Sequence, residues 1–331
     1  MSLSGISGLP PLITLEEHFL SRSVEPGLFK AIISRLEIED KAFDLSHIRL
    51  ADMDASGVTI QFISHCASFS GKRDCMVINN DIATAVKAHP NRFAGLASLP
   101  MGEPAAAAEE LRRCIRDLGI SGAMIDNHVN GKYYEAYEYD VFWSTAQELD
   151  SPIYLHPTLA TNSMKEWYDG SYSPAAAASM SMDAFGWHYD TATHITRIYA
   201  AGVFDRFPKL KIVLGHFGES LPFWKQRIAT SKGLGALARS FNEVYDENLW
   251  FTTSGVFGIA PLACMLQNTA PERIMFSIDY PFTPMAEGMI WLEELRNSGL
   301  VSQEQLEMIC HGNAEKLFGL PSTPSTLGLI V

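Results

Sequence analysis

The stretch LITLEEHF at residues 12–19 places charged side chains at the end of an apolar run. Its aliphatic residues are typical of a strand in a buried sheet. Side chains alternate along a strand, so we expect Glu16 and His18 on one face and Glu17 on the other. A carboxylate and an imidazole that point together from the end of a core strand indicate a site for binding or chemistry.

Seven further short apolar runs follow, separated by longer stretches with helical periodicity such as EPAAAAEELRRCIRDLG (103–119). They are VTIQFISH (58–65), FAGLASLP (93–100), SGAMIDN (121–127), PIYLHP (152–157), KIVLGH (211–216), LWFTTSG (249–255) and IMFSIDYP (274–281). Strands that alternate with helices predict an α/β fold with parallel strands, and eight such units predict a (β/α)8 TIM barrel. A doubly wound open sheet is the structural alternative, but the motifs GxGxxG and GxxxxGKS are both absent.

Nothing in the sequence divides the chain, so residues 1–331 are predicted to form a single domain. The longest connection follows the fifth strand at residues 158–187, and its small and aromatic residues are typical of a lid or an oligomer contact. The tail at residues 321–331 is predicted to be a strap or disordered.

Composition excludes several classes of partner. The net charge is −13 and there is no run of Lys or Arg, which argues against nucleic acid and favours a small organic molecule. No segment approaches the roughly eighteen apolar residues of a membrane span, and no signal peptide is apparent, so a cytoplasmic protein without membrane contact is predicted. The 5 cysteines are scattered and odd in number, which predicts small buried side chains rather than disulfides or a thiolate zinc site.

Ionisable residues end several of the predicted strands: Glu16, His18, His156, His216 and Asp279. In a parallel barrel the carboxyl ends of all strands share one face, so these side chains are expected to converge there. Each one alone is more often a buried or turn-forming side chain, but together they would be costly without a compensating charge. Two of these imidazoles and the two carboxylates suit one divalent cation.

Neighbouring residues extend the predicted site. Glu219 follows His216 by three residues and is expected to hold its imidazole, which suggests a catalytic pair. Arg227 could receive a substrate carboxylate, with a surface ion pair as the equal alternative. His65 and His128 come at or just after strand ends and are expected near the mouth of the barrel.

Five motifs give the chain a family resemblance: EEHF, YLHP, LGHFGE, SIDYPF and the closing NAEKLFGL. They resemble the amidohydrolase-2 group of the amidohydrolase superfamily, and within it the non-oxidative aromatic acid decarboxylases, such as those acting on gamma-resorcylate, 2,3-dihydroxybenzoate, salicylate and 5-carboxyvanillate. The match spans nearly the whole chain. Many relatives begin with H-x-H, whereas Glu16 at the first position resembles the decarboxylase branch.

The resemblance implies a set of roles. The implied metal ligands are Glu16, His18, His156 and Asp279; the implied catalytic residues are Asp279, His216 and Glu219; Arg227, Phe282 and His65 are the expected substrate contacts. One divalent cation is implied, with zinc as first choice and manganese or magnesium as alternatives, and no organic cofactor. A homo-oligomer, dimer or tetramer, is also implied.

The predicted reaction is removal of carbon dioxide from an ortho-hydroxy aromatic carboxylate such as a dihydroxybenzoate, with Asp279 protonating the ring carbon. The alternative is a metal-dependent hydrolase of a small ester, lactone or amide, because the same ligands could activate water. A third reading is a barrel that has lost catalysis and serves as a binding or scaffold protein, which the complete ligand set disfavours.

Overall fold

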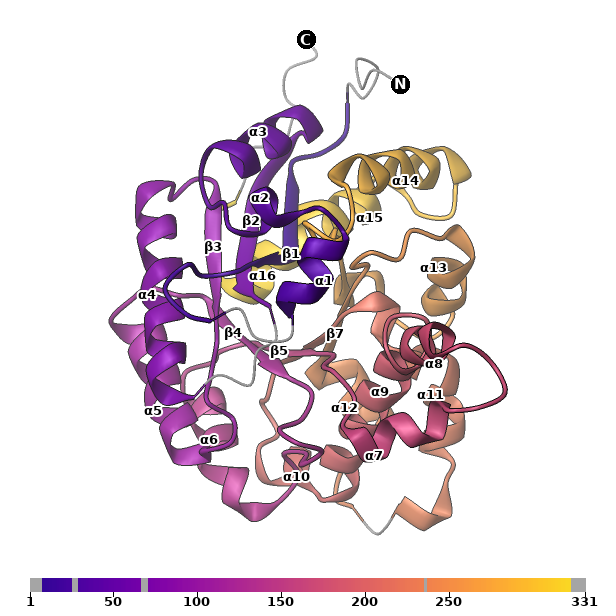
Figure 1. Cartoon of the computed structure of the whole chain (residues 1–331). Coiled ribbons are helices and arrows are strands. Elements are labelled where there is room, and N and C mark those ends of the chain that lie inside the picture. Colours follow the sequence, from indigo (N-terminus) through magenta and orange to yellow (C-terminus); the bar gives the residue numbers. More distant parts are fainter. Residues whose placement is uncertain (1–7, 26–28, 67–70, 235–236, 323–331) are drawn as a thin grey trace.

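Eight parallel strands, paired in chain order, form the barrel that the sequence predicts (Figure 1). The computed structural model describes residues 8–25, 29–66, 71–234 and 237–322. The strands are β1 Leu12–Phe19, β2 Val58–His65, β3 Phe93–Ala97, β4 Gly122–Asp126, β5 Ile153–His156, β6 Ile212–Leu214, β7 Leu249–Thr252 and β8 Ile274–Met275. Single-domain (β/α)8 architecture is therefore confirmed.

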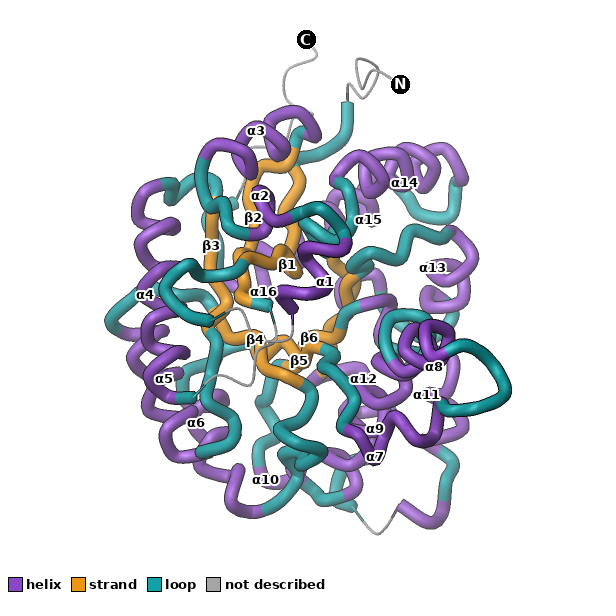
Figure 2. Tube along the Cα trace, viewed as in Figure 1, coloured by secondary structure: helices purple, strands orange, loops and turns teal. Residues whose placement is uncertain are grey.

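Helices surround the ring of strands (Figure 2). The α-helices are α1 Phe29–Arg35, α2 Glu39–Ala42, α3 His47–Ser56, α4 Lys72–Ala88, α5 Pro104–Arg116, α6 Asp140–Glu148, α7 Asn162–Lys165, α8 Pro174–Ser181, α9 Gly186–Ala200, α10 Val203–Arg206, α11 Leu221–Ala229, α12 Phe241–Asn248, α13 Ile259–Leu266, α14 Met285–Ser298, α15 Gln303–Glu307 and α16 Asn313–Phe318. Short 3₁₀ turns lie at Tyr137–Tyr139, Glu166–Tyr168, His216–Gly218, Lys232–Leu234 and Pro271–Arg273, and a π-helical turn lies at Met308–Gly312.

The strands are buried on both faces, which explains their nearly continuous apolar sequences. Inward-facing side chains such as Ile13, Leu15 and Tyr154 pack in a core inside the barrel. Outward-facing ones such as Leu12 and Leu155 pack in the larger core against the helices. The alternation along β5 puts His156 on the same inner side as Tyr154, at the carboxyl end of the strand.

An irregularity in β1 decides which of its charged residues face inward. The pairing of β1 with β2 shifts register between Thr14 and Glu17, as a β-bulge does. Strict alternation from Ile13 and Leu15 would carry Glu17 into the barrel. With the shift, Glu16 reaches the inner site and Glu17 lies on the other side, as predicted from the sequence.

The last strand meets the first through very few contacts. β8 has two residues, and beyond it a single parallel bridge joins Glu17 to Tyr280. The backbone N–H of His18 donates to the Tyr280 carbonyl at 2.6 Å. The Glu17 carboxylate accepts the backbone N–H groups of Ile278 and Tyr280 at 3.0 and 3.1 Å. The seam of the barrel is therefore closed in part by side chains, namely the Glu17 carboxylate and Ser277, whose Oγ accepts the backbone N–H of Glu16.

Other expectations have mixed outcomes. The connection at 158–187 contains α7 and α8 and exposes large aromatic residues, with Trp167 88% accessible. Residues 323–331 of the predicted tail lie outside the described residues. Four cysteines are buried as expected, but Cys264 on α13 is exposed, so that prediction was wrong there. No helix among the described residues has the length and apolar character needed to cross a bilayer.

Candidate active site

Three predicted ligands meet at the carboxyl end of the barrel. Glu16 and His18 come from β1 and His156 from β5, and all three are buried. Oε1 of Glu16 lies 3.0 Å from Nε2 of His156 and 3.7 Å from Nε2 of His18. The two imidazole rings meet edge to face at 4.8 Å. Potential ligand atoms of these three residues lie within 4.8 Å of one another.

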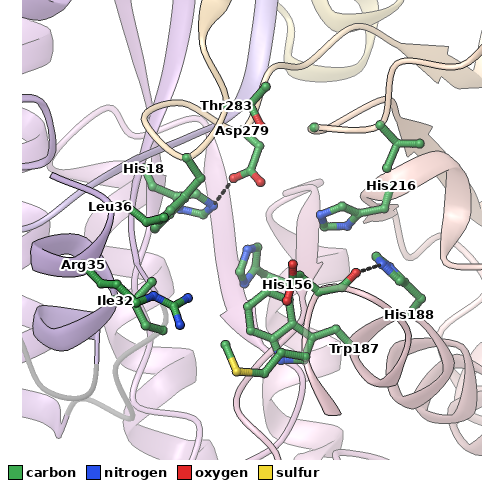
Figure 3. Close-up of a pocket in the computed structure, with 15 residues that line it drawn as sticks. His18, Ile32, Arg35, Leu36, His156, Trp187, His188, His216, Asp279 and Thr283 are labelled. Atoms are coloured by element: carbon green, nitrogen blue, oxygen red, sulfur yellow. Dashed lines mark hydrogen bonds and ion pairs between the residues drawn. The ribbon is translucent and has the colours of Figure 1, made fainter. Parts of the chain in front are cut away.

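Asp279 completes the group from beyond β8. Its Oδ1 lies 3.4 Å from Nε2 of His18, and Figure 3 shows its carboxylate facing the same space as His18, His156 and His216. The sequence placed Asp279 and His216 at strand ends, but both follow their strands. Their backbones adopt φ values of 70° and 48°, which no extended strand can contain. The convergence holds because both residues still lie at the carboxyl rim.

The donor set fits a divalent cation. Within the described chain, the buried Oε1 of Glu16 and Nδ1 of His156 have no hydrogen-bond partner. Burial lowers the pKa of His18 to about 4, which keeps its imidazole in the neutral, ligating form. Burial would raise the pKa of Glu16, but the charge of His216 and contacts with His156 hold that pKa well below its usual value. A buried carboxylate oxygen that faces imidazole nitrogens without an aligned hydrogen bond is an arrangement that a cation satisfies.

A hydrogen-bond network inside the barrel orients the side chain of Glu16. The hydroxyl of Tyr154 donates to Oε2 of Glu16 and lies 2.6 Å from Oγ1 of Thr252. The backbone N–H of Glu16 donates to Oγ of Ser277 at 2.8 Å. The sequence reading did not single out Tyr154, although period-two spacing from His156 places it on the inner face. These contacts leave Oε1 as the oxygen that faces the imidazoles.

The catalytic pair predicted from LGHFGE lies in an unusual turn after β6. The side chains of His216 and Glu219 are joined through Nδ1 and Oε1 at 2.8 Å. Residues 216–220 all have φ between 48° and 78°, and only Gly218 tolerates this freely. Left-handed non-glycine residues cost roughly 1–3 kcal/mol each and gather at functional sites. The turn directs Nε2 of His216 toward Oε1 of Glu16, 4.0 Å away.

Electrostatics set the protonation of this region. Burial would lower the pKa of His216, but the charges of Glu219 and Glu16 outweigh it and raise that pKa to about 10. Burial together with the charge of Glu16 raises the pKa of Asp279 well above its usual value. The group therefore contains both an imidazole disposed to hold a proton and a carboxyl disposed to accept one.

A cavity of about 390 Å³ opens above these groups. Its lining comprises His18, Ile32, Arg35, Leu36, His156, Met182, Asp183, Trp187, His188, His216, Gly255, Val256, Asp279, Phe282 and Thr283. Phe282, predicted as a substrate contact, lies here with its ring 5.7 Å from that of His18. Among the described residues, Arg35 is the one Lys or Arg in the lining, and Figure 3 shows its guanidinium directed inward. The sequence reading missed Arg35.

Other predicted contacts lie elsewhere in the single chain. Arg227 is exposed and lines a separate open groove with Tyr189 and Trp224, so within the single chain it does not join the candidate metal ligands. His65 is buried at the end of β2, where its Nδ1 contacts the Cys66 carbonyl at 2.8 Å, and it is outside the cavity lining. His128 is also buried, with Nε2 3.7 Å from Oδ2 of Asp190.

A (β/α)8 barrel with imidazoles and carboxylates gathered at its carboxyl rim is the architecture of a metal-dependent enzyme. The chain belongs to the amidohydrolase family, whose model matches residues 70–320. It is 42% identical to decarboxylase orsB of Emericella nidulans, over 93% of this chain and 97% of that protein. It is 32% identical to gamma-resorcylate decarboxylase of Polaromonas sp., over 93% and 98%.

Solved structures agree with these relatives. A dihydroxybenzoic acid decarboxylase from Polaromonas sp., with bound manganese and the inhibitor 2-nitroresorcinol, matches with a TM-score of 0.84 at 30% identity, over 95% of this chain and 98% of that one. A 2,6-dihydroxybenzoate decarboxylase in complex with 2,6-dihydroxybenzoate matches with a TM-score of 0.82 at 29% identity, over 94% and 100%. The resemblance inferred from the motifs is therefore confirmed.

Proposed function

We propose that this protein is a carboxy-lyase that releases carbon dioxide from an aromatic acid bearing a hydroxyl group ortho to its carboxylate. The observation that carries the proposal is the cavity of about 390 Å³, with apolar walls that suit a benzene ring and the ligand cluster at its floor. The decarboxylase relatives, which align over nearly the whole chain, support the same reaction.

The cation would be held by Glu16, His18, His156 and Asp279. When bound, it supplies Lewis-acid polarisation of substrate oxygens. Zinc, manganese and magnesium all accept these ligands, and the manganese in the Polaromonas structure favours manganese over the zinc expected from the sequence. Homo-oligomeric assembly and a cytoplasmic location stay predictions.

In the proposed reaction, Asp279 delivers a proton to the ring carbon that bears the carboxylate. A C–H bond forms there, the bond to the carboxyl carbon then breaks, and its electron pair restores the aromatic ring as carbon dioxide leaves. No oxidant or reductant is consumed. His216, held by Glu219, is placed to stabilise the phenol oxygen or to return a proton to Asp279.

The walls of the cavity would position the ring. Phe282 offers an aromatic face beside His18. The guanidinium of Arg35 offers a positive charge that could bind an anionic substrate at the cavity. The sequence had assigned this role to Arg227.

The test is turnover of a panel of hydroxybenzoates by protein of known metal content. Acids with an ortho hydroxyl, such as 2,6- and 2,3-dihydroxybenzoate, should yield carbon dioxide and the corresponding phenol. The isomer 3,5-dihydroxybenzoate has no ortho hydroxyl and serves as the matched negative control. Activity confined to esters, lactones or amides would identify the hydrolase alternative and refute the proposal.

Replacing the proposed acid should separate binding from chemistry. Asp279→Asn retains the size of the side chain but cannot deliver a proton, so we expect turnover to fall by at least about 100-fold, the low end for general acid catalysis. Product formation is measured at matched metal content. An Asn variant with near-normal turnover would remove Asp279 from the role of acid.

A further inference from the structure

Glu219 has a second imidazole partner that the predicted catalytic pair does not include. His188, on α9, approaches Oε2 of Glu219 with its Nδ1 at 2.6 Å, while His216 approaches Oε1 at 2.8 Å. The two imidazole rings lie 5.0 Å apart. Glu219 is fully buried, so its two oxygens are held from opposite sides by two histidines.

The other nitrogen of His188 is also occupied. Its Nε2 lies 2.9 Å from the backbone carbonyl of Asp183, so both ring nitrogens of His188 face acceptors, namely this carbonyl and the Glu219 carboxylate. Asp183 belongs to the connection that follows β5 and lines the cavity together with Met182 and Trp187. His188 therefore joins a wall of the cavity to the buried carboxylate beside His216.

Because Glu219 is buried, loss of its contact with His188 should disturb the position of its carboxylate. A carboxylate without access to water needs partners at both oxygens, and an unpaired buried oxygen is strongly unfavourable. If His188 were absent, Glu219 would have to turn toward another donor or toward water entering from the cavity. Either movement would loosen the bond that orients the ring of His216.

We propose that His188 is a positioning residue for catalysis, which acts by fixing the carboxylate of Glu219 and thereby the imidazole of His216. The inference rests on the proposed decarboxylation but concerns a residue to which no role was assigned from the sequence. His188 lies at the edge of the cavity rather than among the metal ligands, so its effect should appear in the chemical step while the metal remains bound.

Two variants at this position test the role, with one control on the same helix. His188→Ala should lower kcat by about tenfold or more, the range for residues that orient a catalytic group, with KM and metal content unchanged. His188→Gln, which keeps a side-chain donor, should recover part of that loss. Thr193→Ala changes an exposed residue of α9 and should behave as wild type. Added imidazole should restore turnover to the Ala variant, relative to wild type at the same imidazole concentration.

A crystal structure of the His188→Ala variant tests the positioning role independently of the proposed reaction. We expect the Glu219 carboxylate to have left the Nδ1 atom of His216, a result that needs no substrate. A Glu219 in its original position, or wild-type kcat in the Ala variant, overturns the positioning role. A rise in KM alone would likewise overturn it, because it would assign His188 only to the cavity wall. If wild-type protein turns over none of the panel, the reaction fails but the displaced carboxylate still supports the inference.

Discussion

At the scale of single residues, the two oxygens of Glu16 do different work. Oε2 accepts the hydroxyl hydrogen of Tyr154, whereas Oε1 faces the imidazoles of His18 and His156 without an aligned hydrogen bond. A ligand fixed at one oxygen presents the other in a constant direction, which lowers the reorganisation needed to bind a cation.

Tyr154→Phe should therefore weaken metal binding. The variant keeps the ring in the inner core but removes the donor to Glu16, and loss of such an orienting partner typically costs about 10- to 100-fold in affinity. Competition between the metal-free protein and a chelator measures the change. Tyr137→Phe, at a tyrosine that is 76% exposed, is the matched control. Unchanged affinity in Tyr154→Phe would show that the hydroxyl does not set the ligand direction.

Substitution of the two candidate arginines, Arg35 and Arg227, should have different effects on KM. Arg35→Ala removes the guanidinium at the cavity, and loss of a charged hydrogen bond of about 1.5–3 kcal/mol should raise KM by roughly 10- to 100-fold. Arg227→Ala removes a side chain from a separate groove and should leave KM unchanged. Steady-state kinetics on both variants decide between them, and the opposite pattern would reinstate the assignment made from the sequence.

Residue-level prediction succeeded where a strand set the direction of a side chain. Glu16, His18 and His156 could be placed because period-two alternation and the shared rim of a parallel barrel leave them little choice. Arg35 could not, because it ends the short helix α1 and no repeating pattern relates the faces of that helix to the barrel. His188 is similar: its approach to Glu219 depends on how α9 packs, which no local spacing encodes.

At the scale of elements, β1 and the segment after β8 act as a unit. The bulge in β1 turns Glu16 inward and leaves Glu17 free to accept the N–H groups on both sides of Asp279. The carboxylate of Glu17 thus binds the backbone of the rim, while its neighbour Glu16 offers a ligand atom from the same strand. The sequence indicated that the two side chains diverge, but not that Glu17 would hold the backbone around Asp279.

Glu17→Gln should damage both stability and metal binding. The amide nitrogen of Gln is a donor and cannot replace the second carboxylate oxygen, so the buried N–H of either Ile278 or Tyr280 is left without its partner, at a cost of about 1–3 kcal/mol. Chemical denaturation and metal titration report the two effects. Glu304→Gln, at an exposed position on α15, is the control. Wild-type stability with wild-type affinity in Glu17→Gln would contradict the role of this carboxylate.

Strand order and number followed from the sequence, but strand length did not. The runs at 211–216 and 274–281 read as strands throughout, whereas β6 has three residues and β8 has two. Apolar composition reports burial, and buried segments beyond a strand are apolar as well. The left-handed backbone at His216 and Asp279 is set by packing at the rim, so composition carries no signal for it.

At the scale of the whole molecule, acid sensitivity should depend in part on a buried histidine, His194, which is not among the proposed metal ligands. Nε2 of His194 accepts the backbone N–H of Tyr134 at 3.0 Å, and its Nδ1 lies 3.1 Å from Oδ1 of Asn127. Burial lowers the pKa of His194 to about 3. The unfolded chain, with a pKa near 6.5, binds the proton more readily, so stability is complete above about pH 6.5 and is lost as the pH falls toward 3.

This single group should reduce the free energy of unfolding by at most about 1.4 kcal/mol per pH unit across that window. His194→Gln should be less stable at neutral pH but should show a shallower decline on acidification, measured by chemical denaturation at pH 7.5 and pH 5. His47→Gln, at an exposed histidine, should retain the wild-type slope. Identical slopes for all three proteins would exclude His194 as the source.

The sparse junction between β8 and β1 has a consequence for how the protein matures. Glu16 and His18 belong to the first strand, whereas Asp279 follows the last, so the ligand group spans a junction that a single bridge pairs among the described residues. A metal ion bound there would link the first strand, β1, to the segment that follows the last strand, β8. Metal binding and closure of the barrel would then occur together. A chain whose first and last strands had not yet met would lack a complete metal site.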